Sequence, residues 1–154
     1  MKALFVVGYI ACGKSTYVES IRQQDDLVIE LGSVVRELTH QEERVFDNNL
    51  DDAIYEYCKE LIGQYIDQIT RVIFVAPRSP QLLDKLVTII DDYDIVFLSS
   101  TYSVREARFN KSKRAKDEGL TYDEALRKDD SIGMGRLVDN LFNNHWGPFE
   151  LKNY

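Results

Sequence analysis

The chain has 154 residues, 44% of them hydrophobic, and a formal net charge of −7 at pH 7. This length and composition are typical of one globular domain with a single core. The acidic balance argues against a polyanion as the main partner, and no apolar run is long enough to cross a membrane. The charge is uneven, because residues 105–116 contain six basic residues and one acid, which gives +5 there and −12 elsewhere.

The first expected elements are a strand, a glycine turn and a helix. Residues 3–7 form a continuous apolar run, as in a buried parallel strand, and Tyr17, Val18 and Ile21 recur at helical spacing. Between them, residues 8–16 read GYIACGKST and fit the pattern G-x-x-x-x-G-K-[ST]. Backbone N–H groups in such a turn point at phosphate oxygens, and the following helix adds its positive dipole end. The stretch therefore predicts a binding site for the phosphates of a nucleotide.

Two side chains of this loop have the clearest expected roles. Lys14 adds a positive charge at the β- and γ-phosphates, and the Ser15 hydroxyl is a ligand for Mg²⁺. Cys12 and Cys58 have no metal-like spacing and are expected to be reduced, structural thiols. The residues predicted to bind the nucleotide are Gly8, Ala11, Cys12, Gly13, Lys14, Ser15 and Thr16.

A second strand and helix are expected next. Residues 27–29 form a short apolar run, and Ser33 is the expected N-cap of a helix through residues 34–38. Residues 39–49 are polar and nearly without apolar periodicity. We expect them to form an irregular, mobile connection or a frayed helical piece.

The strongest helical pattern covers residues 50–69, where apolar side chains repeat at intervals of three and four. A strand at 72–75, a helix including 82–90 and a strand at 95–98 follow. Strands that alternate with helices predict a three-layer α/β/α fold with a parallel sheet, whose ligands bind at the carboxyl ends of the strands. The segments expected to converge there are residues 8–15, 30–36, 76–81 and 99–108.

The last third of the chain differs from this alternation. Thr121 begins a capping box that predicts a short helix over residues 125–130. Residues 131–135 loosen the chain before an amphipathic helix at 137–142. Residues 143–154 are expected to be irregular and to cover the sheet.

These motifs together resemble the nucleoside and deoxynucleoside monophosphate kinases, adenylate kinase and dephospho-CoA kinase in particular, in a compact phage-type form. Besides the phosphate loop, residues 32–36 (GSVVR) resemble the family's G-D-x-x-R segment. Residues 76–81 (APRSPQ) resemble a shortened F-P-R-T-x-x-Q stretch. Residues 127–130 with Arg136 are similar to the R-x-D-D…R pattern at the end of the family's lid.

The resemblance implies a single P-loop kinase domain over residues 1–154 with a helical lid at about 103–136. It implies that Arg36 and Arg78 bind the acceptor phosphate and that Gln81 reads the acceptor base. Planar guanidinium groups suit this task because they grip phosphates through two bonds. The cations implied in catalysis, which stabilise the transferring phosphoryl group, are Lys14, Arg108, Arg127 and Arg136. The lid's leading arginines fall in the region of Arg105, Arg108 and Arg114.

Two departures from the family pattern affect the magnesium and acceptor sites. Phe74 stands where the family has an aspartate that supports magnesium. Glu30, at the end of the second strand, is the candidate substitute and is counted with the substrate-binding residues, a plain surface acid being the alternative. Ser33 replaces the aspartate of the G-D pair.

The function expected is phosphoryl transfer from ATP, with Mg²⁺, to a nucleoside or deoxynucleoside monophosphate in the cytoplasm, without a membrane partner. One alternative is a kinase acting on DNA or RNA, at a strand end or on a hydroxymethylated base. Residues 105–116 with Tyr102 and Phe109 would then form a single-strand groove, whereas a solvated helix face is the simpler interpretation of such a charge run. The other alternative is a nucleotide-binding switch or ATPase, which requires an acid after a strand. Strands 72–75 and 95–98 both end without one.

Overall fold

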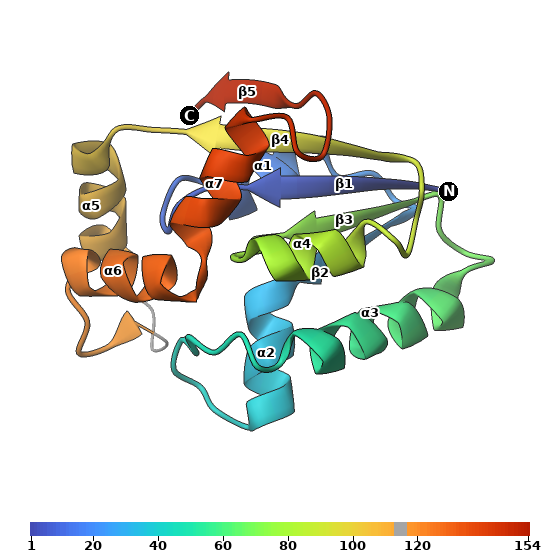
Figure 1. The fold of residues 1–154 in the computed structure, drawn as a ribbon, viewed down its shortest axis with the longest axis horizontal. Helices are drawn as coiled ribbons and strands as arrows, with labels where there is room; N and C mark the ends of the chain where they lie inside the picture. The colour runs from blue at the N-terminus through green and yellow to red at the C-terminus, as the bar shows by residue number, and fades with distance from the viewer. Residues whose placement is uncertain (113–116) are drawn as a thin grey trace.

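The computed structural model describes residues 1–112 and 117–154. One five-stranded sheet, with strand order β2-β3-β1-β4-β5 and parallel pairing throughout, forms its centre (Figure 1). The expected parallel α/β fold is confirmed. The strands are β1 (Lys2–Val7), β2 (Asp26–Glu30), β3 (Arg71–Val75), β4 (Tyr93–Ser99) and β5 (Glu150–Asn153).

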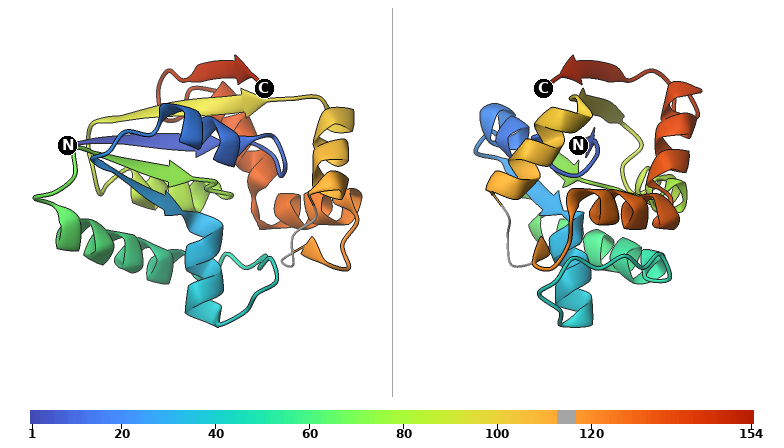
Figure 2. Two further views of the ribbon diagram at one scale, coloured as in Figure 1. Left: turned by 180° about the vertical axis from the view of Figure 1, so that it is seen from behind. Right: turned by 90° about the vertical axis from the view of Figure 1, so that its left-hand side faces the viewer.

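Helices connect these strands and cover both faces of the sheet. The helices are α1 (Lys14–Ile21), α2 (Leu31–Thr39), α3 (Asp51–Tyr65), α4 (Pro80–Leu86), α5 (Tyr102–Lys111), α6 (Tyr122–Ile132) and α7 (Met134–Phe142). Because both faces are covered, the central strands are apolar on both sides. Phe5 and Phe74 face α3, α4 and α7, whereas Val6 and Ile73 face α1 (Figure 2). The two phenylalanine rings stack with their centroids 4.8 Å apart.

Helices α5 and α6 lie beyond the carboxyl ends of the strands (Figures 1 and 2). The capping box that begins α6 is present, because the Thr121 hydroxyl accepts from Glu124 N and the Glu124 carboxylate accepts from Thr121 N. A single residue, Gly133, separates α6 from α7. The connection through residues 40–50 is irregular, as expected.

The N-cap of α2 is Glu30, so the prediction of Ser33 was wrong. The Glu30 carboxylate accepts hydrogen bonds from Gly32 N at 3.0 Å and Ser33 N at 2.8 Å. An acid at the strand end satisfies two N–H groups that the first helical turn leaves without partners. The helix therefore begins directly after β2, at Leu31.

Two helices are shorter than their apolar repeats, and one strand was not expected. α3 ends at Tyr65, where the next side chain, Ile66, is 50% exposed. α4 ends at Leu86, and tight turns through Thr88 and Ile89 lead to β4. Residues 150–153 form the edge strand β5 rather than irregular chain; most of its side chains are exposed, so it has no strong strand pattern.

No helix in the described part of the chain is both long enough and apolar enough to span a membrane. Both cysteines are free and buried, as expected of structural thiols. Burial raises the pKa of Cys58 to about 12.

Candidate active site

A cavity of about 450 Å³ opens at the carboxyl ends of β1, β2 and β3. Its walls come from the loop after β1, the start of α2, the segment before α3, the end of β3, and helices α5 and α6. The charged side chains that line it are Lys14, Glu30, Arg36, Arg44, Arg78, Arg108, Lys111, Asp117 and Asp129. Six cations and three carboxylates give this cavity a positive excess, although the whole chain is acidic.

The loop after β1 has the geometry that its sequence predicts. Ala11 and Gly13 have positive φ values of 64° and 101°, which turn the backbone around the cavity. The Lys14 ammonium donates to the Gly8 carbonyl at 2.8 Å and to the Tyr9 carbonyl at 2.9 Å. Six of the seven predicted nucleotide-binding residues, Lys14 among them, line the cavity, and the side chain of the exception, Cys12, is buried.

Arg108 connects this loop to the end of the chain. Its Nη1 donates to the Cys12 carbonyl at 3.1 Å, and its Nη2 donates to the Tyr154 carbonyl at 3.0 Å. The Tyr154 ring lies against Gly13, where an added Cβ would come within 2.6 Å of it. The guanidinium group of Arg108 therefore lines the cavity at the phosphate loop, on the side of α5.

Arg36 and Arg78 form the opposite side of the cavity. Arg36 Nη2 lies 3.3 Å from Glu30 Oε2 in an ion pair, and it also donates to the Ser33 hydroxyl at 3.0 Å. Arg78 donates to the Val45 carbonyl at 2.8 Å and lies 3.4 Å from the Asp129 carboxylate. Burial lowers the pKa of Arg78, but an arginine stays protonated at any physiological pH.

Asp129 brings a carboxylate from α6 into this group of cations. Its side chain is 2% exposed. Burial raises its pKa, and the positive charges of Arg78, Lys14 and Arg44 oppose that rise. The buried carboxylate of α6 thus interacts electrostatically with Lys14 of the phosphate loop and with Arg78 and Arg44.

Arg44 and Asp117 were not among the predicted site residues. Arg44 belongs to the connection between α2 and α3, and Asp117 lies between α5 and α6. They form a two-bond ion pair, Nε to Oδ1 at 2.7 Å and Nη2 to Oδ2 at 3.3 Å. An ion pair between residues so far apart in the sequence has no local pattern that would have revealed it.

Besides Cys12, three predicted site residues do not line the cavity. Gln81, in the first turn of α4, and Arg127, on α6, are exposed to solvent. Arg136 is also exposed, near the junction of α6 and α7, close to Ser79. Their roles stay predictions, whereas Glu30, Arg36, Arg78 and Arg108 do line the cavity with Lys14.

One cation of the basic segment at residues 105–116 packs against aromatic rings inside the fold. Arg105 lies over the ring of Tyr9 at 4.8 Å and near the ring of Tyr122 at 5.9 Å. Tyr122, whose pKa burial raises to about 12, donates its hydroxyl proton to the Ile10 carbonyl. Arg108 and Lys111 of this segment line the cavity, whereas Lys113, Arg114 and Lys116 lie outside the described residues.

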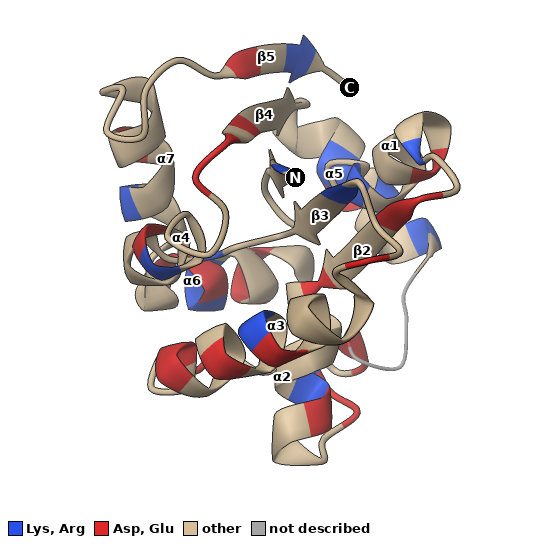
Figure 3. Ribbon diagram, turned by 90° about the vertical axis from the view of Figure 1, so that its right-hand side faces the viewer, with Lys and Arg blue, Asp and Glu red and all other residues tan. Residues whose placement is uncertain are grey.

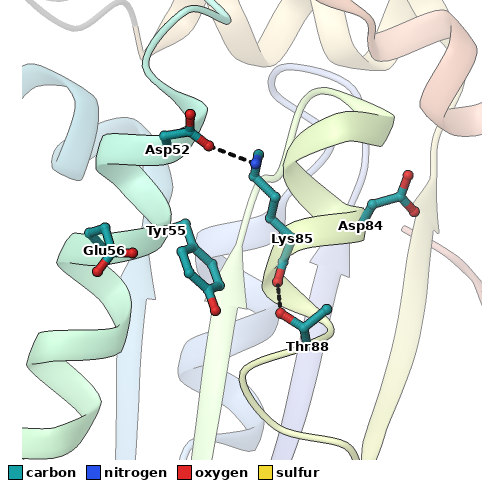
Figure 4. A pocket seen from close by; sticks show the side chains of 6 residues that line it. All are labelled: Asp52, Tyr55, Glu56, Asp84, Lys85 and Thr88. Carbon is teal, nitrogen blue, oxygen red and sulfur yellow. Dashed lines mark hydrogen bonds and ion pairs between the residues drawn. The ribbon is translucent and has the colours of Figure 1, made fainter.

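A second hollow lies on the outer surface, between α3 and α4 (Figure 4). Acidic residues recur along α3 in Figure 3. In this hollow, Lys85 Nζ lies 2.6 Å from Asp52 Oδ1, and Tyr55, Glu56 and Asp84 also line it. It shares no lining residue with the larger cavity and contains no phosphate-binding pattern.

Comparison with known proteins identifies the fold. No protein-family model matches the sequence, and no curated protein matches it significantly. A crystal structure of shikimate kinase from Bacteroides thetaiotaomicron matches with a TM-score of 0.57 and 18% identity, over 97% of this chain and 85% of that chain. An unliganded sugar kinase from Janibacter sp. HTCC2649 matches with a TM-score of 0.57 and 17% identity, over 92% of this chain and 95% of that chain.

A chain from the structure of the Pnkp1/Rnl/Hen1 RNA repair complex is also similar. Its TM-score is 0.63 at 16% identity, over 90% of this chain and 45% of that chain. At these identities the similarity establishes the fold alone. The chain has the P-loop kinase fold, as residues 8–16 predicted, and these matches do not assign it to the adenylate kinase branch.

Proposed function

We propose that this chain is a kinase that transfers the γ-phosphoryl group of ATP to a small acceptor that itself carries a phosphate. A nucleoside or deoxynucleoside monophosphate is the leading acceptor. The observation that carries the proposal is that Arg36 and Arg78 line the same cavity as Lys14 and Ser15. A donor on the loop after β1 and an acceptor phosphate on the two guanidinium groups would share this cavity.

The donor side fits a magnesium-bound triphosphate. The Ser15 hydroxyl, in the first turn of α1, lines the cavity and would hold Mg²⁺ together with phosphate oxygens. When bound, the ion offsets the negative charge of the β- and γ-phosphates. The Lys14 ammonium donates to two loop carbonyls, which phosphate oxygens would replace as acceptors. In the described residues, no group of three metal-ligating side chains competes for the ion.

On the acceptor side, the protein supplies position and charge. Arg36 and Arg78 bind and orient the acceptor phosphate, which is already ionised and needs no base to become a nucleophile. Glu30 is bonded to the start of α2 and to Arg36, so we assign it to orienting Arg36 rather than to magnesium. Lys14 and Arg108 stabilise the charge that spreads over the transferring group.

The alternative acceptor is a nucleic acid, for which residues 105–116 would form the groove. Of the six basic side chains in this segment, Arg105 lies over the ring of Tyr9 and Arg108 lines the cavity at the phosphate loop, so neither belongs to a separate groove. This observation favours the small acceptor over the nucleic acid.

The test is transfer of labelled γ-phosphate from Mg-ATP to a panel of acceptors: all ribo- and deoxynucleoside monophosphates, dephospho-CoA, and single- and double-stranded DNA. We expect transfer to at least one mononucleotide. Lys14→Ala should lower that rate by about 100-fold or more, because a charge aimed at the transferring group is lost. Lys59→Ala, which removes an exposed lysine of α3, should leave the rate unchanged.

Two outcomes would contradict the proposal. Transfer into DNA alone would establish the nucleic-acid kinase, and its binding should weaken steeply with salt because counterions are released. Release of ADP without any labelled acceptor would leave a switch or ATPase.

A further inference from the structure

Each arginine on the acceptor side of the cavity already has a carboxylate partner that also lines the cavity. Carboxylate and phosphate oxygens fit the same guanidinium edge, so each partner occupies a place that an acceptor phosphate would compete for. The three pairs are Arg36–Glu30 at 3.3 Å, Arg44–Asp117 at 2.7 Å and Arg78–Asp129 at 3.4 Å.

The Arg44–Asp117 pair is the shortest of the three and joins opposite sides of the cavity. The α2–α3 connection, which carries Arg44, approaches the segment between α5 and α6, which carries Asp117 (Figures 1 and 2). The side chains are 14% and 5% exposed. The guanidinium group and the carboxylate are therefore largely shielded from water, although both residues line the cavity.

The other two arginines would keep protein partners if their carboxylates moved away. Arg78 also donates to the Val45 carbonyl, and Arg36 also donates to the Ser33 hydroxyl. In the described part of the chain, the hydrogen bonds that Arg44 donates go to Asp117. An acceptor phosphate that displaces Asp117 would thus accept hydrogen bonds from both Nε and Nη2 of Arg44.

We infer that Arg44 is a third ligand of the acceptor phosphate and that Asp117 is its resident counter-anion, which the acceptor displaces. The inference rests on the proposed function, because it requires an acceptor that carries a phosphate. Asp117 then makes the site selective for phosphorylated acceptors over unphosphorylated analogues. A phosphate repays the loss of the ion pair with its own charge, whereas the neutral hydroxyl of an unphosphorylated analogue does not.

The inference is tested by binding rather than by turnover. The full chain is saturated with Mg²⁺ and a non-hydrolysable ATP analogue and is titrated in a calorimeter with each nucleoside monophosphate and its parent nucleoside. Asp117→Asn removes the competing charge and should tighten monophosphate binding by about fivefold or more. Parent nucleosides and the ATP analogue should bind as they do to the wild type.

Glu118→Gln is the matched control, because it makes the same change of charge at the neighbouring, exposed position. It should bind monophosphates as the wild type does. Arg44→Met is the second variant and should weaken monophosphate binding by about tenfold, the loss of a charged hydrogen-bond partner. It remains informative if Asp117→Asn folds poorly, and circular dichroism of each variant checks its fold.

Unchanged or weaker monophosphate binding by a folded Asp117→Asn variant would overturn the inference. The Arg44–Asp117 ion pair would then only stabilise the fold. Unchanged binding by Arg44→Met, or no monophosphate binding by any of these proteins, would also overturn the inference. Failure of the proposed function is a separate result. A chain that binds monophosphates as expected and transfers no label keeps the assignment of Arg44 but is not the proposed kinase.

Discussion

Asp26 and Arg71 show how one ion pair fixes the amino ends of β2 and β3, opposite the cavity. Arg71 Nη2 lies 2.6 Å from Asp26 Oδ2, and the Asp26 side chain is fully buried. The hydrogen bond from Arg71 lowers the pKa of Asp26 below its ordinary value. The stabilisation is therefore complete above the unfolded pKa, near 3.9, and is lost as the pH falls through the lower folded pKa.

Asp26→Asn should lower the free energy of unfolding at pH 7 by about 2 kcal/mol, because Arg71 loses its charged partner. Urea unfolding at pH 7 and below about pH 3 measures the difference from the wild type, which should shrink at the acidic pH. Asp25→Asn, at the exposed neighbour, is the control. A difference of equal size at both pH values would show that the side chain's charge is not the cause.

At this same scale, the sequence revealed the phosphate-loop residues of the cavity better than the Arg44–Asp117 pair. Lys14 and Ser15 belong to a contiguous pattern whose backbone geometry is local, so their position in the cavity followed from the motif. Arg44 and Asp117 meet only through the tertiary fold, and no spacing rule connects them. Arg136 belongs to a motif matched by resemblance, yet α7 leaves its side chain exposed.

Among the elements, α6 begins with a capping box and carries Asp129, which lines the cavity. The Thr121 hydroxyl accepts from Glu124 N at 3.1 Å, and the hydrogen bonds from Thr121 lower the pKa of Glu124. Thr121→Ala removes the cap and should lower the free energy of unfolding by about 1 kcal/mol. Hydrogen exchange should accelerate first in the initial turn of α6.

Thr121→Ser keeps an accepting hydroxyl and should match the wild type in both measurements. Equal exchange rates in α6 for Thr121→Ala and the wild type would contradict the dependence on the cap. The start of α6 was predictable because the capping box is a local signal of four residues. The edge strand β5 was not, since its pairing with β4 is tertiary and most of its side chains are exposed.

For the whole molecule, the alternation of strands and helices predicted the layers, but it did not predict that Tyr154 packs against the phosphate loop. Tyr154 packs on Gly13 of the phosphate loop and makes an edge contact with Tyr17, their ring centroids 5.8 Å apart. Its backbone N–H donates to the Ser99 carbonyl, and its carbonyl accepts from Arg108. Tyr154 thus contacts β4, α5, α1 and the phosphate loop.

Tyr154→Ala should therefore destabilise the entire fold and not only its last segment. Loss of a half-buried aromatic ring should lower the free energy of unfolding by about 2 kcal/mol. Trp146, the one tryptophan in the sequence, precedes β5 and is 8% exposed, so its fluorescence follows this end of the chain. In urea, its transition should coincide with that of the far-ultraviolet circular dichroism, at a lower midpoint than in the wild type. Tyr154→Phe keeps the ring and should change the midpoint little, whereas a tryptophan transition that precedes the dichroism change would mean that the C-terminal segment unfolds by itself.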